Sequence, residues 1–590
     1  MGNEDLSRAQ NIRTGITYKG MDRQMICNSA VGVCSIAVSM AHSNEAMRPL
    51  ANYPQGLSMD QFLSPPLNNS AFESYTKQVE ALKKTVKDLL VVPMTDPIQK
   101  LHLIYSLCRL GVSYHFEKEI EEQLSHLFIT LPKLLDDKDY DLHTVALVFQ
   151  VFRLNCYKMS CGVFSKFQDD GGKFKEEVVE DVKGMVSLYE ASHFRMHGEA
   201  ILEEALHFTT KHLGSLANQS STSPHLREYI KNALYRAYHY SLHRYEAKLY
   251  ISFYDKEEAR NDTLLELAKY DFNRVQMMYQ QELAVLCRWY KERDFKSKFP
   301  YARHRVVEAL MYAIGMYFEP RYAVARYTTT KQACIMGFTD DTYEAYEFYE
   351  ELENLTDAFE RFDASAMDEL PAGNKRDLYE TVLNDVEEAE NLVQKEGRCH
   401  GISYVKDQWK KYVKAEHAQC RWRHEGVVPT FEEYLEVGAY TSTGFLCMSQ
   451  IMLGIEEADR NAYEWILNQN NKLPRALQIN SRLYNDIVTD NEEEERGYST
   501  ATACYMKQHK VSRDEATEAF RGIIEEGWKD VNEGCMRPTA IPMQVVRAAL
   551  NYHRLLDVAY RYNDEYTFSH SFFKDIITQV LLHPIPLHQE

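Results

Sequence analysis

The residues best suited to chemistry form the acidic cluster Asp340-Asp341-Thr342-Tyr343-Glu344. On a helix, residues three and four apart share a face, so Asp340 and Asp341 both lie beside Glu344. Carboxylates this close repel one another, and a divalent cation would offset the repulsion. Because Mg²⁺ prefers carboxylate, water and phosphate oxygens, the cluster predicts a magnesium site. The cluster alone leaves open an ordinary solvated acidic face, although the apolar residues 333–338 before it favour the mouth of a cavity.

A second set of oxygen-bearing side chains lies about 145 positions further along the chain. Asn485, Thr489 and Glu493 are spaced i, i+4 and i+8, which places an amide, a hydroxyl and a carboxylate in one stripe along a helix. Three oxygen ligands in a row suit a hard cation. The alternative is a solvated acidic stretch, which the run of glutamates at 492–495 also fits.

Three arginines could bind the phosphate groups of a substrate. Arg303 and Arg305 are two residues apart and cannot share a helix face, so they indicate a loop that leads into a helix over 306–317. Arg482 precedes Asn485 by three residues, on a neighbouring turn. Guanidinium forks bind phosphate oxygens in pairs, yet each arginine alone also fits a surface residue. Together, the arginines and the two oxygen stripes could hold several Mg²⁺ ions and a diphosphate.

The elements that must position these groups are helices. The chain has 590 residues, of which 45% are hydrophobic, with 39 Tyr and 26 Phe against only 25 Gly and 17 Pro. From about residue 70, apolar residues recur three and four apart, and period-two alternation is not sustained anywhere, so we predict an all-α protein with almost no sheet. Polar or charged stretches at 214–224 and 255–262 interrupt the pattern. We expect a mobile N-terminal extension (1–47), an N-terminal helical domain (48–260) and a C-terminal catalytic helical domain (261–590).

Net charge and composition narrow the class of partner. The formal charge of −20 argues against nucleic acid, which needs a basic surface. No apolar run reaches the length of about 18–20 residues that a membrane span needs. The 12 cysteines lack metal-binding spacing, which fits reduced thiols in a reducing compartment. Residues 25–41 are small and apolar and follow basic residues, so an organellar or secretory leader remains an alternative.

These motifs give the sequence a family resemblance from about Arg48 to the end. The chain resembles plant class I terpene synthases, most of all the grass-type sesquiterpene synthases. The matching motifs, in order, are residues 301–308, 317–320, 340–346, 424–426, 485–489 and 528–533. The sequence departs from the family pattern where Glu344 replaces a third aspartate and where Tyr312 replaces a tryptophan.

The resemblance implies the αβ architecture of two all-helical domains, with the active site in a barrel-like C-terminal domain. It implies three Mg²⁺ ions, for which Mn²⁺ could substitute, and a prenyl diphosphate substrate. The implied metal ligands are Asp340, Asp341, Glu344, Asn485, Thr489 and Glu493, and the implied diphosphate-binding residues are Arg303, Arg305 and Arg482. Catalytic roles fall to Asp340, Asp341, Arg303 and Tyr566. The residues expected to line a dry pocket for the carbocation are Trp289, Tyr312, Tyr560 and Tyr566.

The favoured hypothesis is a cytoplasmic, monomeric enzyme that ionises and cyclises farnesyl diphosphate and uses no nucleic-acid partner. The amino-terminal arginine-rich motif tied to monoterpene cyclisation is reduced to Arg48-Pro49, which favours a sesquiterpene product. A plastid monoterpene synthase acting on geranyl diphosphate is the alternative. A chain-elongating prenyltransferase is disfavoured because the second motif is of the Asn485/Thr489/Glu493 type. A non-catalytic scaffold is disfavoured because all six metal positions are intact.

Overall fold

The computed structural model describes residues 52–63, 68–92, 96–219, 222–395 and 397–587. Within these ranges the regular structure is helical, and strand-type pairing is limited to an isolated bridge between Gln168 and Phe174. The predicted all-α class is therefore confirmed. The predicted extension over 1–47 lies outside the described residues.

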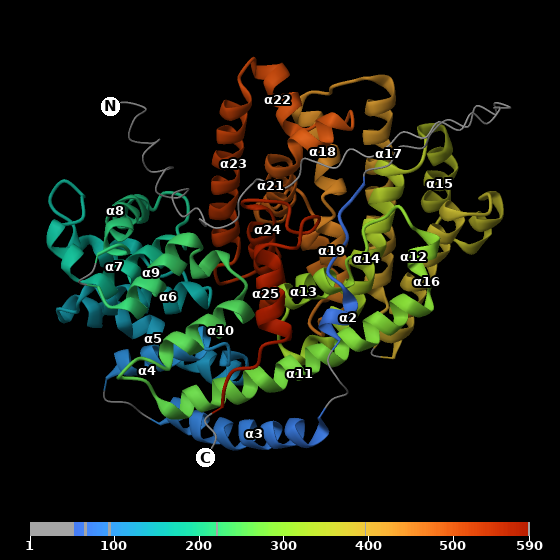
Figure 1. The fold of residues 1–590 in the computed structure, drawn as a ribbon. Helices are drawn as coiled ribbons and strands as arrows, with labels where there is room; N and C mark the ends of the chain where they lie inside the picture. Colours follow the sequence, from blue (N-terminus) through green and yellow to red (C-terminus); the bar gives the residue numbers. More distant parts are fainter. Residues whose placement is uncertain (1–51, 64–67, 93–95, 220–221, 396, 588–590) are drawn as a thin grey trace, which may run out of the picture.

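Most helices of the N-terminal half lie at the left and lower left of Figure 1, and the first long one lies along the bottom. Asp141 begins one of them by accepting a hydrogen bond from the amide of Thr144 at 2.8 Å, as a helix N-cap does. The helical periodicity seen from about residue 70 continues through 193–199, but the helices stop there, and Gly198 has a φ of +80°. The helices are α3 (Asn69–Val91), α4 (Pro97–Arg109), α5 (Glu117–Asp137), α6 (Leu142–Leu154), α7 (Val182–Ser192), α8 (Ala200–Leu216), α9 (Pro224–Tyr235) and α10 (His243–Tyr254).

The C-terminal half surrounds two long helices, α14 and α21. Helix α14 packs against α13, α16, α17 and α19, whereas α21 packs against α18, α22, α23 and α24. Gly527 of α23 lets α21 approach closely, because a Cβ there would lie 2.5 Å from the Asn480 side chain. The helices are α11 (Asp262–Glu292), α12 (Phe295–Lys298), α13 (Val306–Met316), α14 (Ala323–Ala345), α15 (Tyr349–Arg361), α16 (Asn374–Gln394), α17 (His400–Glu425), α18 (Phe431–Thr441), α19 (Gly444–Ile451), α20 (Arg460–Ile466), α21 (Lys472–Glu495), α22 (Ala501–His509), α23 (Arg513–Gly534), α24 (Met543–Tyr560) and α25 (Phe572–Leu581).

A short segment from the start of the described chain lies on the C-terminal half rather than on its sequence neighbours. Residues 52–58 run into α2 (Met59–Phe62), drawn in blue in Figure 1, and α2 packs against α13. The amide of Leu57 donates to the carboxylate of Glu308 on α13 at 2.8 Å, and Arg305 donates to the carbonyl of Pro54 at 2.8 Å. The segment therefore reaches the part of the molecule that holds the predicted arginines.

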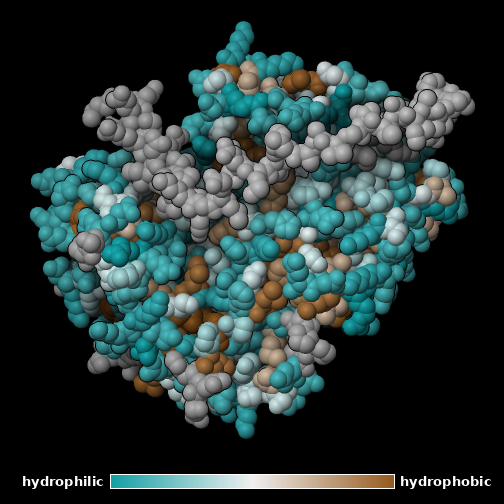
Figure 2. All heavy atoms as spheres, viewed as in Figure 1, coloured by the Kyte–Doolittle hydropathy of each residue, from teal (hydrophilic) through white to brown (hydrophobic). Residues whose placement is uncertain are grey.

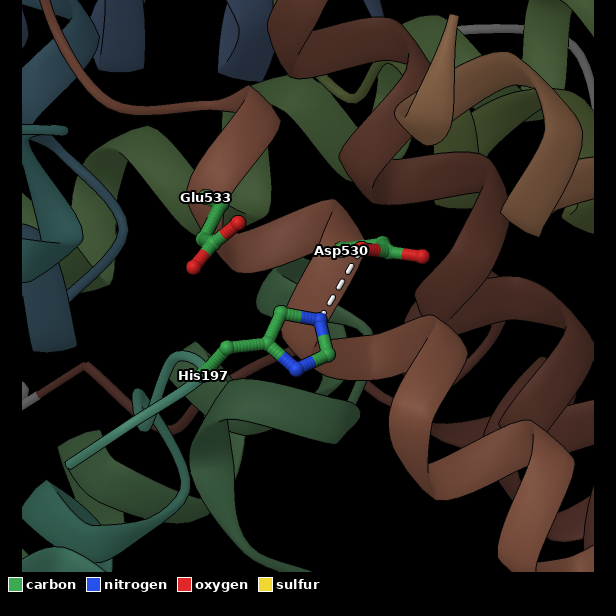
Figure 3. Close-up of side chains that lie close together, drawn as sticks. All are labelled: His197, Asp530 and Glu533. Atoms are coloured by element: carbon green, nitrogen blue, oxygen red, sulfur yellow. Dashed lines mark hydrogen bonds and ion pairs between the residues drawn. The ribbon is translucent and has the colours of Figure 1, made fainter. Parts of the chain in front are cut away.

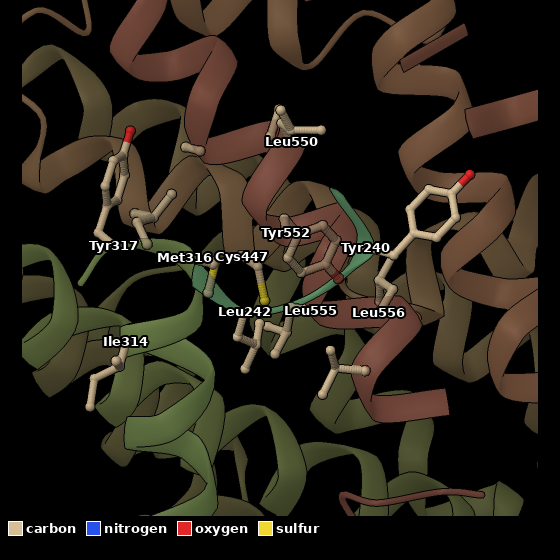
Figure 4. Packing of buried hydrophobic residues seen from close by; sticks show 14 of the residues in the cluster. Tyr240, Leu242, Ile314, Met316, Tyr317, Cys447, Leu550, Tyr552, Leu555 and Leu556 are labelled. Carbon is tan, nitrogen blue, oxygen red and sulfur yellow. The ribbon is translucent and has the colours of Figure 1, made fainter. Parts of the chain in front are cut away.

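Apolar side chains from both halves form one continuous core. Figure 4 shows Leu242, from the loop before α10, lying close to Leu555 of α24. Gly315 of α13 permits this packing, because a Cβ there would lie 3.1 Å from Leu242 and 3.4 Å from Leu555. Burial of apolar surface is the main driving force of folding, so this shared core fixes the two halves against each other.

Most of the face drawn in Figure 2 is hydrophilic, with hydrophobic residues scattered between the polar ones. Some large apolar side chains are exposed singly, such as Ile129 and Val285, and the others include the neighbours Val91 and Val92 and the ring pair of Tyr235 and Tyr562. Among the described helices, none combines the length and the apolar character that crossing a membrane requires.

Candidate metal centre

The acidic cluster lies in the last turns of α14, where Arg303 contacts two of its carboxylates. The Arg303 amide donates to Asp341 Oδ2 at 2.6 Å, and its Nε donates to Asp341 Oδ1 at 2.9 Å. Its guanidinium also forms an ion pair with Asp340. As predicted, Arg303 and Arg305 occupy a loop, and α13 begins at Val306. This loop therefore carries a guanidinium to the carboxyl end of α14.

The stripe on α21 is an interlinked set of polar groups. The Thr489 hydroxyl donates to Glu493 Oε1 at 2.7 Å, and Arg482 contacts both Asn485 and Asp486. Gly438 of α18 makes room for this arginine, since a Cβ there would lie 2.8 Å from Arg482 Cδ. The predicted i, i+4, i+8 stripe is therefore present on one helix with a guanidinium beside it.

Both oxygen-bearing stripes lie toward the carboxyl ends of their helices. The partial negative charge of the helix dipole concentrates there, and it disfavours carboxylates. Neither α14 nor α21 has a basic residue in its last turn. Burial and the charge of Asp340 raise the pKa of the Glu344 carboxyl well above its usual range. The negative charge of these carboxylates is therefore unfavourable in this arrangement, and a bound cation would offset it.

The ends of α14 and α21 meet through Arg496, which follows α21 directly. Its guanidinium lies 3.7 Å from the Glu344 carboxylate and donates to the hydroxyl of Tyr53 at 2.9 Å. The Tyr53 ring also lies against Arg303, with 4.5 Å between the guanidinium carbon and the ring centroid. We call the six predicted ligands Asp340, Asp341, Glu344, Asn485, Thr489 and Glu493 the acidic centre.

Sequence reasoning missed a further carboxylate beside the acidic centre. Glu416 of α17 is fully buried, and one of its oxygens lies within 4.8 Å of oxygens of Asp340 and Glu344. Its signal was present in the sequence: Trp409, Tyr412 and Glu416 fall on the apolar stripe of α17, where a charged residue is out of place. Tyr53 and Arg496, which also border the centre, carried no such signal.

Arg305 differs from Arg303 in what it contacts. Its side chain is buried and donates to three backbone carbonyls, those of Pro54, Tyr566 and Thr567, at 2.8 to 2.9 Å. The structure therefore places its guanidinium under the loop that contains Tyr566, and it joins that loop to the segment at 52–58. Thr567 in the same loop accepts a hydrogen bond from Arg303 at 3.1 Å.

Three of the four aromatic candidates lie together. The ring centroids of Tyr312 and Tyr566 are 5.4 Å apart in an edge-to-face arrangement. Burial raises the pKa of the Tyr312 phenol, and the nearby Tyr560 raises it further. The Tyr566 hydroxyl contacts α14 one turn before the acidic cluster. A Cβ at Gly337 would lie 3.3 Å from this hydroxyl. Trp289 lies elsewhere: it lines a small surface pocket with residues of α16, such as Glu388.

A second group of titratable side chains offers a useful contrast. His197, Asp530 and Glu533 bring three candidate ligand atoms within 4.8 Å of one another (Figure 3). Lys472 lies 3.4 Å from the Asp530 carboxylate and 3.5 Å from that of Glu533. This group is therefore a network between the N-terminal half and α23, and a basic side chain, Lys472, already lies beside its two carboxylates.

The charge at the acidic centre is not balanced in this way. Counting Glu416 and Asp486 beside it, six carboxyl groups lie near three guanidinium groups: Asp340, Asp341, Glu344, Glu416, Asp486 and Glu493 near Arg303, Arg482 and Arg496. Hard oxygen ligands with unmatched negative charge fit Mg²⁺ or Mn²⁺. The residues present thus suit a divalent cation bound together with an anionic group.

Comparison with known proteins gives two matches to family models that cover most of the chain. Residues 57–234 match the model of the terpene synthase N-terminal domain, and residues 291–530 match the terpene synthase metal-binding domain. The second match contains every residue of the acidic centre.

Whole-length relatives match over 92% of this chain. A hedycaryol synthase of Camellia brevistyla is 44% identical, and a valerianol synthase of Camellia hiemalis is 43% identical, each aligned over 98% of its own length. Among solved structures, limonene synthase with 2-fluorolinalyl diphosphate superposes with a TM-score of 0.85 at 28% identity, covering 92% of this chain and all of that one. Grey poplar isoprene synthase with three Mg²⁺ ions and dimethylallyl-S-thiolodiphosphate superposes with a TM-score of 0.80 at 28% identity, covering 90% and 99%.

Proposed function

The chain belongs to the terpene synthase family, and we propose from that premise that its acidic centre ionises a prenyl diphosphate. The chain is a sesquiterpene synthase, like the hedycaryol and valerianol synthases it resembles, and it cyclises farnesyl diphosphate with release of diphosphate. The observation that carries the proposal is the meeting of two oxygen-bearing helix ends, α14 and α21, with Arg303 and Arg482 beside them.

The acidic centre would hold three Mg²⁺ ions. The three ions in the grey poplar isoprene synthase complex support this number. Asp340, Asp341 and Glu344 would supply oxygens from α14, and Asn485, Thr489 and Glu493 would supply them from α21. Bound Mg²⁺ neutralises the diphosphate and makes it a better leaving group.

The arginines would bind the diphosphate that leaves. Arg303 now shares its hydrogen bonds between Asp340 and Asp341. Once those carboxylates turn toward a cation, its planar fork is free to bind diphosphate oxygens in pairs. Arg482 could do the same from α21. Arg305 is already engaged with backbone carbonyls, so we assign it the role of holding the Tyr566 loop over the site.

The carbocation would be formed beside Tyr312, Tyr560 and Tyr566. Aromatic faces stabilise a nearby cation through their quadrupoles, and a desolvated position strengthens the effect. Exclusion of water protects the cation from premature capture. Trp289 has no part in this proposal, because its ring lies beside Lys331 and lines a different pocket, which it shares with residues of α16.

Two further assignments accompany the proposal. Every side chain of the acidic centre belongs to one chain, so the enzyme can act as a monomer. We place it in the cytosol, and a fusion of residues 1–60 to a fluorescent protein tests this assignment. A diffuse signal supports it, whereas a plastid signal would favour the monoterpene alternative.

Product analysis tests the function itself. Purified protein with Mg²⁺ is incubated separately with C10, C15 and C20 prenyl diphosphates, and the volatiles are separated by gas chromatography. We expect a cyclic C15 product from farnesyl diphosphate with the highest kcat/KM of the three. Turnover of geranyl diphosphate without any C15 product would refute the sesquiterpene assignment, and a longer linear diphosphate formed with isopentenyl diphosphate would indicate chain elongation.

A further inference from the structure

Glu416 is the most unusual carboxylate in the described part of the C-terminal half. It projects from the middle of α17, between the buried residues Trp409 and Cys420, and its side chain is fully buried. Among the described residues no donor meets either of its oxygens at hydrogen-bonding geometry, although the Tyr412 hydroxyl lies nearby. Burial of a carboxylate without a partner is costly, and native proteins rarely retain one without a compensating cation.

The neighbours of Glu416 indicate where such a cation would bind. One Glu416 oxygen lies within 4.8 Å of oxygens of both Asp340 and Glu344. Two oxygens bound to one Mg²⁺ lie about 3 to 4 Å apart, given metal–oxygen distances of about 2.0–2.1 Å. A small rotation of these side chains therefore brings all three oxygens to one ion.

The basic side chains nearby form ion pairs with other carboxylates. Arg303 pairs with Asp340 and Asp341, and Arg496 lies beside Glu344. Arg482 pairs with Asp486 and Glu493 on its own helix. Glu416 thus lies beside two other acids, and within the described part of the chain it forms no ion pair, although Arg482 acts on it electrostatically.

We propose that Glu416 is a further metal ligand of this protein, which extends the divalent-cation site from α14 and α21 to a third helix, α17. The proposal rests on the proposed metal-dependent function. Glu416 of α17 would bind the same divalent cation as Asp340 and Glu344, either directly or through one bound water. A third carboxylate would raise the affinity for the ion on the α14 side, because affinity in oxygen sites rises with the number of charged ligands.

The test measures metal binding rather than turnover. Calorimetric titration with Mg²⁺ in the presence of inorganic pyrophosphate is carried out on the unchanged protein, on Glu416→Gln and on Glu533→Gln. The last variant is a matched control, because it removes the same charge from the ion-paired group of Figure 3. We expect Glu416→Gln to weaken Mg²⁺ binding by about tenfold or more and Glu533→Gln to leave it unchanged.

Thermal unfolding of the same proteins without metal separates a ligand from a structural residue. Because two acids lie beside Glu416 and it forms no ion pair among the described residues, Glu416→Gln should unfold at the same temperature as the unchanged protein or higher. It should lose most of the stabilisation that Mg²⁺ and pyrophosphate confer. A variant that fails to fold, or that unfolds earlier without metal, would overturn the proposal by showing a structural role. Unchanged Mg²⁺ affinity in a folded Glu416→Gln would overturn it too.

Failure of the proposed function would look different. If the unchanged protein binds neither Mg²⁺ nor pyrophosphate, the metal-dependent function fails and the assignment of Glu416 fails with it. If the unchanged protein binds both and Glu416→Gln binds them equally well, the function stands and only the role of α17 is wrong.

Discussion

Each half of the molecule buries an arginine among tyrosines and carboxyl groups, yet the two surroundings differ in charge. In the N-terminal half, Arg109 donates to the hydroxyls of Tyr105 and Tyr229 at 3.0 and 3.2 Å and lies over the ring of Tyr238. In the C-terminal half, Arg303 contacts two ionisable carboxylates and faces several more.

The difference lies in how each charge is balanced. The pocket beside Arg109, about 180 Å³ in volume, contains Glu190 and Glu246, and burial raises the pKa of both carboxyls so that protons can neutralise them. Around Arg303 burial raises the pKa of the Glu344 carboxyl as well, to about 8. The difference there is number: six carboxyl groups lie near three arginines, and two helix ends add further negative potential. A buried arginine therefore does not mark a functional site by itself. An excess of one sign of charge, brought together by the fold, marks such a site.

The largest expected effect comes from removing one charge of the acidic centre. Asp340→Asn keeps the shape of the side chain but removes a carboxylate that faces Glu344 and Glu416. We expect turnover of farnesyl diphosphate to fall by about 10²–10³-fold, as when one electrostatic contact to a transition state is lost. The unfolding temperature without metal should be unchanged or higher. Steady-state kinetics and calorimetry check both, and full activity would show that this carboxylate is not a ligand.

The corresponding change in the N-terminal half should act on stability instead. Arg109→Met fills similar space but leaves the Tyr105 and Tyr229 hydroxyls without their donor. Loss of one partner of a buried charged network costs about 3 kcal/mol. Urea unfolding measures this loss, and we expect kcat of the folded variant to change by less than about twofold. A large fall in kcat with normal stability would mean that the two halves do not differ as described.

A pH series sharpens the comparison further. Burial, with Arg109 opposing it and Glu246 adding to it, raises the pKa of Glu190 from 4.5 to about 7. The folded state then binds a proton that the unfolded state has released, so stability is lost as pH rises from about 4.5 to 7. Glu190→Gln should remove about 3 kcal/mol of this loss, seen as a flatter curve of unfolding temperature against pH. The exposed control Glu177→Gln should reproduce the original slope.

The smallest effect is expected where the sequence departs from its family pattern. Glu344→Asp retains the charge and shortens the side chain by one methylene, while Arg496 remains beside it. We expect the Mg²⁺ concentration for half-maximal activity to change by less than about tenfold. A change as large as that of Asp340→Asn would show that the length of this side chain is critical.

The sequence was a good guide to the elements and to the polar stripes they carry. Helical spacing predicted α21 and its stripe of Asn485, Thr489 and Glu493, because residues four apart share a helix face in any packing. The loop at Arg303 followed from the same geometry. The break at 193–199 was not predicted, since apolar spacing continues across it while the backbone turns at Gly198.

Contacts between distant segments could not be predicted in this way. The positions of Tyr53 against Arg303 and of Glu416 beside Asp340 depend on how helices pack, which the periodicity of one helix does not encode. Trp289 was an aromatic candidate by residue type, yet α11 turns it toward Lys331. Arg305 matched a phosphate-binding pattern, but it is occupied by backbone carbonyls.

The most direct test of the central claim is the location of metal ions. Crystals grown with Mn²⁺ and inorganic pyrophosphate are measured at the manganese absorption edge, where anomalous scattering identifies each ion. We predict peaks between the ends of α14 and α21, at coordinating distance from Asp340 and from Glu493, with pyrophosphate between them. Ions only at His197, Asp530 and Glu533, or pyrophosphate bound without any ion, would contradict the account.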